Sequence, residues 1–146
     1  MRFAIVLLTG LTLAACSARS GEDDDASLSD MFGDWSSELE ARNNSGVRGT
    51  GGVQSVAAGA AARVTIRGAV SGSHHPWHVH RGTCSTGGTI VGDPNAYTPL
   101  HVGTDGTATS TATINVALNE EERYHINVHR SPTELSVIVS CGDLRN

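Results

Sequence analysis

The chain has 146 residues, a formal net charge of −5 and only 4% aromatic residues. This length accommodates one domain of moderate size together with a shorter segment. Its ten cationic side chains are all arginines, and no stretch concentrates them into the basic surface that nucleic-acid binding requires. A nucleic-acid partner is therefore not expected.

Residues 1–15 have the pattern of a secretion signal. One positive charge at Arg2 precedes an apolar run over residues 3–13 that is too short to cross a bilayer as a helix. The run ends in Leu-Ala-Ala-Cys, which resembles the lipobox of bacterial lipoproteins and implies that Cys16 carries a lipid. An ordinary signal peptide followed by a coincidental cysteine is the alternative. In both cases the mature protein leaves the cytoplasm, and a lipid would anchor it in the cell envelope, facing the periplasm or the outer surface.

Residues 16–34 are predicted to form a flexible acidic tether. They contain six carboxylates and one arginine, and they have too few large apolar side chains to fold alone. Residues 35–146 contain nine acidic groups and eight arginines, so this predicted domain is nearly neutral.

The domain is predicted to be all-β. Glycine, threonine, serine and valine are abundant, and no segment sustains the apolar period of a helix. A loop is expected over residues 81–100, where glycine and proline recur. Strands are expected at residues 35–42, 47–57, 62–70, 107–116, 124–129 and 135–140, and in the histidine-rich stretch that begins at residue 74. Seven or eight short strands with frequent turns are typical of a Greek-key barrel or sandwich.

Four of the seven histidines lie in the stretch from His74 to Cys84. Alternate side chains of a strand point to opposite faces, so Trp77 and Val79 are predicted to face the core, with His78 and His80 on the outer face. Two imidazoles at this spacing can bind one metal ion, and imidazole suits copper, zinc, iron and nickel. A polar outer face that binds no metal is the alternative. In the strand at residues 124–129, the same alternation predicts that His129 points outward.

Cys84 and Cys141 remain as a pair once Cys16 is assigned to the lipid. In an oxidising compartment, such a pair is predicted to form a disulfide. The bond would close a loop of 57 residues, for which the chain-entropy model gives about 4 kcal/mol of stabilisation. Two free thiols that serve as soft metal ligands are the alternative.

Four short motifs resemble, in type and order, those of copper–zinc superoxide dismutases. They are His75-Pro76-Trp77-His78-Val79-His80, Gly82-Thr83-Cys84, Asn127-Val128-His129 and Cys141-Gly142. The resemblance covers residues 47–146 at low overall identity. It implies a Greek-key β-barrel in which His78, His80 and His129 bind one copper ion. It also implies that Cys84 and Cys141 form the family's disulfide, and that His75 has a structural rather than a ligating role.

The sequence also departs from this family. Residues 81–100 contain no histidine, so the bridging imidazolate and most zinc ligands are missing, and no zinc site is expected. Ile138 stands where the family has an arginine that attracts and positions superoxide. His101 is a candidate fourth ligand, with an exposed loop histidine as the alternative. His74 and His125 are expected at the surface.

The resemblance implies a copper-only, lipid-anchored relative that slowly converts superoxide to dioxygen and hydrogen peroxide. A non-catalytic copper carrier or buffer that uses the same three histidines is the main alternative. A structural envelope domain that binds no metal is a further alternative.

Overall fold

A computed structural model describes residues 33–146 of the chain. The predicted signal peptide, Cys16 and all but the last two residues of the predicted tether lie outside the described residues. Within residues 33–146, no helix has both the length and the hydropathy needed to cross a membrane.

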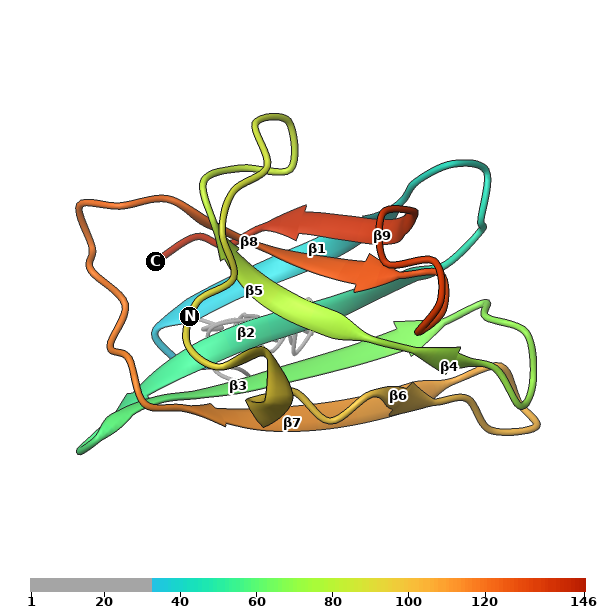
Figure 1. The fold of residues 1–146 in the computed structure, drawn as a ribbon, viewed down its shortest axis with the longest axis horizontal. Coiled ribbons are helices and arrows are strands. Elements are labelled where there is room, and N and C mark those ends of the chain that lie inside the picture. The colour runs from blue at the N-terminus through green and yellow to red at the C-terminus, as the bar shows by residue number, and fades with distance from the viewer. Residues whose placement is uncertain (1–32) are drawn as a thin grey trace, which may run out of the picture.

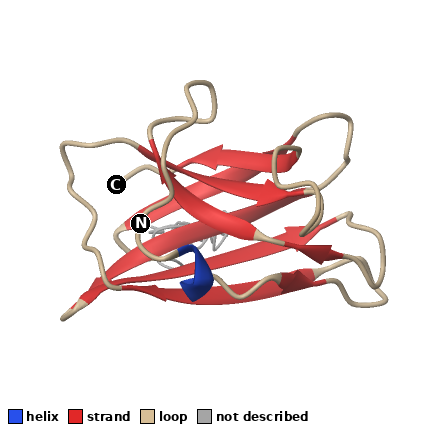
Figure 2. Cartoon of the chain, in the orientation of Figure 1, coloured by secondary structure: helices blue, strands red, loops and turns tan. Residues whose placement is uncertain are grey.

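The described residues are all-β, which confirms the predicted fold class (Figure 2). Nine strands and one short 3-10 helix follow one another along the chain. They are β1 (Trp35–Ala41), β2 (Arg48–Val56), β3 (Gly59–Arg67), β4 (His74–His75), β5 (Trp77–Arg81), η1 (Pro94–Ala96), β6 (Leu100–His101), β7 (Ala108–Ile114), β8 (Tyr124–His129) and β9 (Ile138–Asp143).

Two short strands raise the number above the predicted seven or eight. Pro76 divides the histidine-rich stretch into β4 and β5, because proline has no backbone N–H to contribute to a strand ladder. The predicted loop over residues 81–100 contributes its last residue, Leu100, to the two-residue strand β6. Its partner is β4, and the two strands form a separate antiparallel ribbon.

Seven strands form one antiparallel sheet in the order β5-β8-β9-β1-β2-β3-β7. The sheet curls into a half-barrel, and the β4–β6 ribbon lies beside β7 (Figure 1). The chain crosses three times between the two ends of the strand order: from β3 through β4 to β5, from β5 through β6 to β7, and from β7 to β8. The first crossing places the histidine-rich strand β5 at one edge of the sheet, directly against β8.

The segment between β5 and β6 covers both edges of the curled sheet. On one side, the amide of Val91 donates to the carbonyl of Val79 on β5, at 2.9 Å. On the other side, the hydroxyl of Ser110 on β7 donates to the carbonyl of Thr98, at 2.5 Å. This segment therefore bridges the two edges of the half-barrel, and it also lies against the strand that carries two of the candidate metal ligands.

The core lies inside the curl of the sheet. Trp77 and Val79 are fully buried there, on the face that strand alternation predicts. The Trp77 ring packs edge-on against Tyr97, with centroids 5.2 Å apart, and its indole N–H donates to the carbonyl of Thr98 at 2.8 Å. These contacts hold the covering segment onto the core beneath β5.

Candidate metal centre

Three imidazoles come together where β5 pairs with β8. His78 and His80 are on β5, and His129 is the last residue of β8. One ligating atom from each of the three residues lies within 4.8 Å of the others. The structure thus brings together the three histidines that the sequence singled out as candidate ligands.

Strand pairing explains this convergence. His78 lies directly opposite Asn127, so His129 is two residues from the position facing His78, on the same side of the sheet. The pairing of β8 with β9 shifts register between Val128 and His129. The amide of His129 donates to the carbonyl of Pro76, the residue directly before β5, at 2.8 Å. The backbone that carries the third imidazole is therefore fixed to the strand that carries the other two.

Backbone carbonyls orient two of the three rings. His80 Nδ1 lies 3.0 Å from the carbonyl oxygen of Gly88, and His129 Nδ1 lies 2.6 Å from that of Leu135. A carbonyl oxygen only accepts hydrogen bonds, so each Nδ1 carries the hydrogen and each Nε2 is left with a lone pair. Metal-binding histidines are typically held in this way by a partner on the other ring nitrogen.

The nitrogens left with a lone pair lie close to one another. His80 Nε2 is buried and has no hydrogen-bond partner among the described residues. His129 Nε2 lies 3.0 Å from His78 Nδ1, which can donate to it in the metal-free protein. A metal ion would bind Nε2 of His80 and His129 and Nδ1 of His78, with the hydrogen of His78 moved to its Nε2. An unpaired buried nitrogen would gain a partner, so the residues present fit a metal ion.

The three candidate ligands are much less exposed than the sequence analysis predicted. His78 and His80 are each 8% exposed and His129 is 5% exposed. They do lie on the face opposite the core residues, but that face is covered rather than open to solvent. Loops provide the cover: Gly88 belongs to the segment after β5, and Leu135 to the segment between β8 and β9.

Burial also keeps the three rings uncharged. It lowers the pKa of His78 to about 4, with further contributions from the charges of His129 and His80. Burial likewise lowers the pKa values of His80 and His129, although the carbonyls of Gly88 and Leu135 act in the opposite direction. At neutral pH the rings are therefore neutral, which is the form that binds metal ions.

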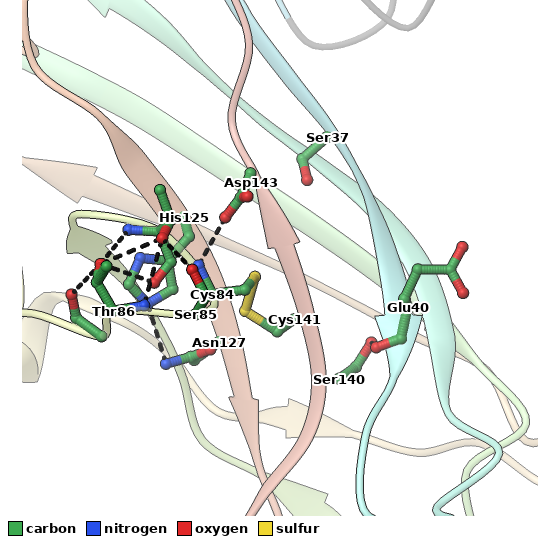
Figure 3. The surroundings of a disulfide bond; sticks show 12 residues. Ser37, Glu40, Cys84, Ser85, Thr86, His125, Asn127, Ser140, Cys141 and Asp143 are labelled. Carbon is green, nitrogen blue, oxygen red and sulfur yellow. Dashed lines mark hydrogen bonds between the residues drawn. A yellow bond between two sulfur atoms is a disulfide. The ribbon is translucent and has the colours of Figure 1, made fainter.

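His125 was expected at the surface, and that expectation is wrong. It is fully buried, lies directly opposite His80 in the strand register, and stacks on the His80 ring with centroids 5.1 Å apart. Figure 3 draws it among the residues that surround the Cys84–Cys141 disulfide. His125 is not one of the three converging ligands, but it supports one of them. Its burial could not be predicted from the sequence, because it depends on the register between β5 and β8 that places His125 opposite His80.

His101 does not join the three histidines. It lies on β6, directly opposite His74 of β4, and the two ring centroids are 4.2 Å apart. His74 and His101 are both exposed. The candidate fourth ligand therefore belongs to a different pair, because its position is set by the β4–β6 ribbon.

His75 contacts a ligand without joining the centre. Its Nδ1 lies 2.9 Å from the backbone carbonyl oxygen of His129, and its Nε2 lies 2.9 Å from the hydroxyl of Ser73. His75 is 6% exposed. This buried bridge helps to position the end of β8, and it agrees with the structural role that the resemblance implies for His75.

The predicted disulfide between Cys84 and Cys141 is confirmed. It ties the start of the segment after β5 to β9, and the Cys84 amide donates to Asp143 Oδ1 at 2.6 Å (Figure 3). Gly88, whose carbonyl orients His80, lies four residues further along the same segment. The disulfide therefore helps to fix the segment that orients one of the ligands.

Ile138 lies directly opposite His129 in the register of β8 and β9. At this position the resemblance leads us to expect an arginine that attracts superoxide. The side chain next to the ligand is thus apolar and half-buried. Arg130 follows His129 in the chain, but its guanidinium is exposed and lies 3.8 Å from the carboxylate of Glu134. This guanidinium is therefore paired with a carboxylate.

No family model matches this chain, and a search of the curated proteins finds no match. The resemblance to copper–zinc superoxide dismutases therefore rests on the order of the four motifs and stays a proposal.

Proposed function

We propose that this chain is a copper-binding envelope lipoprotein of the superoxide dismutase type, anchored through a lipid on Cys16. The observation that carries the proposal is the convergence of three buried imidazoles, two of which have Nδ1 held by a backbone carbonyl. The four ordered motifs support the choice of family, and the curled antiparallel sheet is the kind of fold that the family requires.

The three histidines define what the centre can bind. Among divalent ions of the first transition row, copper binds nitrogen ligands most tightly, and it accepts imidazole readily. A bound copper ion would supply a one-electron couple, by which one superoxide is oxidised to dioxygen and a second takes up an electron and two protons to form hydrogen peroxide. His101 pairs with His74 and is not placed to deliver these protons, so they would come from water.

Turnover is expected to be slow. Charged funnels raise the association rates of charged substrates by factors of roughly 10 to 1000. Here Ile138 lies beside His129 in place of a cation, and the chain as a whole carries a net charge of −5. Superoxide is an anion, so neither feature would attract it to the centre.

A non-catalytic copper carrier or buffer is the second candidate. The burial of the three ligands favours it, since residues that are 5% to 8% exposed leave little open surface for a substrate. The apolar Ile138 is equally compatible with this function. The two candidates share the same metal site and differ only in turnover.

An assay of superoxide removal by the copper-loaded protein distinguishes the dismutase from the non-catalytic carrier. The protein is loaded with one equivalent of copper and compared with free copper and with a His129→Ala variant. Thr113→Ala, at an exposed position on β7, serves as the matched control. Activity above that of free copper, lost in His129→Ala and kept in Thr113→Ala, supports the dismutase. Tight copper binding without such activity supports the carrier, and failure of the wild-type protein to bind copper tightly refutes both.

The lipid anchor needs a separate test. The wild-type chain should fractionate with membranes, and mass spectrometry should find an acyl modification on Cys16. Cys16→Ser should release the protein into the soluble fraction. An unmodified Cys16 in the wild-type chain would refute the lipoprotein assignment and leave the metal centre unaffected.

A further inference from the structure

His74 and His101 form a second histidine pair, outside the three-histidine centre. They are direct partners in the antiparallel β4–β6 ribbon, and their ring centroids are 4.2 Å apart with the planes inclined by 59°. Both residues are exposed. No hydrogen bond to either ring is found within the part of the chain that the structure describes.

The backbone under this pair is fixed on both strands. Next to His101, Leu100 is fully buried in the core. Next to His74, His75 is buried and bonded to the carbonyl of His129. On the other side of the pair, the amide of Val102 donates to the carbonyl of Ser73 at 3.0 Å. Metal sites depend on firm placement of their ligands, and here two solvent-exposed rings stand on a ribbon held by these contacts.

The chemistry of the pair favours a shared cation. Residues directly opposite each other on antiparallel strands have Cβ atoms about 4.5–5.5 Å apart, so their side chains meet. Two imidazoles at this separation offer two nitrogen donors on the same side of the ribbon, and water can supply the other ligands. Nickel, copper and zinc accept this donor set, and copper(II) binds it most tightly.

We propose that His74 and His101 form a second, solvent-exposed site for a divalent ion of the copper, nickel and zinc class. Two protein ligands in open solvent bind more weakly than three buried ones, so this site exchanges its ion more readily than the three-histidine centre. The proposal does not depend on the function of that centre, because the two sites share no residue. It also gives His101 a role that differs from the expected fourth ligand.

Equilibrium dialysis of the full chain against copper(II), followed by elemental analysis, tests the second site. The wild-type chain should bind one ion tightly and another more weakly. His74→Ala and His101→Ala should each lose the weaker ion and keep the tighter one, whereas His129→Ala should lose the tighter ion and keep the weaker one. Thr104→Ala, an exposed position near the ribbon, should bind as wild type does. Failure of the three-histidine centre would therefore remain distinguishable from failure of this site.

A second measurement needs no variant of the pair. In NMR spectra of His129→Ala, substoichiometric copper(II) should broaden the ring signals of His74 and His101 before those of His75 and His125, which are buried. The proposal is overturned if His74→Ala and His101→Ala bind the same number of copper ions as the wild type with the same affinities. It is overturned equally if the signals of the pair broaden no earlier than those of the buried histidines.

Discussion

Acidification should destabilise the metal-free protein through the histidines of the candidate metal centre. Burial and the charges of His129 and His80 lower the pKa of His78 from its ordinary value of 6.5 to about 4 in the folded state. The unfolded chain exposes this ring and restores its ordinary pKa, so the unfolded state binds a proton first as the pH falls. Stability is therefore fully present above about pH 6.5, decreases between about pH 6.5 and about pH 4, and levels off below that range.

The size of the effect follows from the two pKa values. The interval between 6.5 and about 4 corresponds to a loss of at most about 3 kcal/mol for His78. Because the ring keeps some contact with water, we expect about half of this loss for His78 alone. Burial also lowers the pKa values of His80, His125 and His129, so these rings change stability in the same direction.

Urea unfolding of the metal-free chain at pH 7.5 and pH 4.5 measures this difference. The lower pH avoids the acidic range in which Asp34 and Asp105, whose pKa values are lowered by hydrogen bonds to Ser55 and Thr107, would add their own effect. His78→Ala should show a smaller loss of stability between the two pH values, and Thr113→Ala should show the full loss. Equal free energies of unfolding at both pH values in the wild type would refute the burial argument, as would an undiminished pH dependence in His78→Ala.

Three further predictions concern the surroundings of the centre. Trp77→Ala should lower the free energy of unfolding by about 3–5 kcal/mol in urea titrations, since it empties a fully buried site; a loss under 1 kcal/mol would contradict this placement. Reduction of the disulfide should lower the free energy of unfolding by about 4 kcal/mol in the chain-entropy model. It should also lower copper affinity in a chelator competition, because the bond fixes the segment that orients His80; an unchanged affinity would show that this segment holds its position without the disulfide. Gly88→Ala should weaken copper binding, since the new Cβ would collide with the backbone carbonyl of Arg81. Gly87→Ala is the matched control, because its backbone has a positive φ of 64° but open space around the Cβ position, and an equal loss in both variants would refute the steric argument.

Much of the centre could be predicted because it depends on local strand geometry. Side chains of a strand alternate between faces whatever surrounds the strand, so Trp77 and Val79 could be assigned to the core and His78 and His80 to the opposite face. The all-β class follows in the same way from turn residues and from the lack of a helical period. The disulfide could be predicted because two cysteines remain after Cys16 is set aside.

Only the tertiary structure decided what covers the outer face and which histidines meet across strands. The carbonyls of Gly88 and Leu135 reach the rings of His80 and His129 from loops, and loops have no periodicity from which their path could be predicted. The partners of His125 and His101 depend on the register between strands that are distant in the chain. That register is set by the packing of the whole sheet, since a shift of one residue would send every side chain to the other face. For this reason the sequence could name the three candidate ligands, but it could not show that they are buried or that His101 pairs with His74.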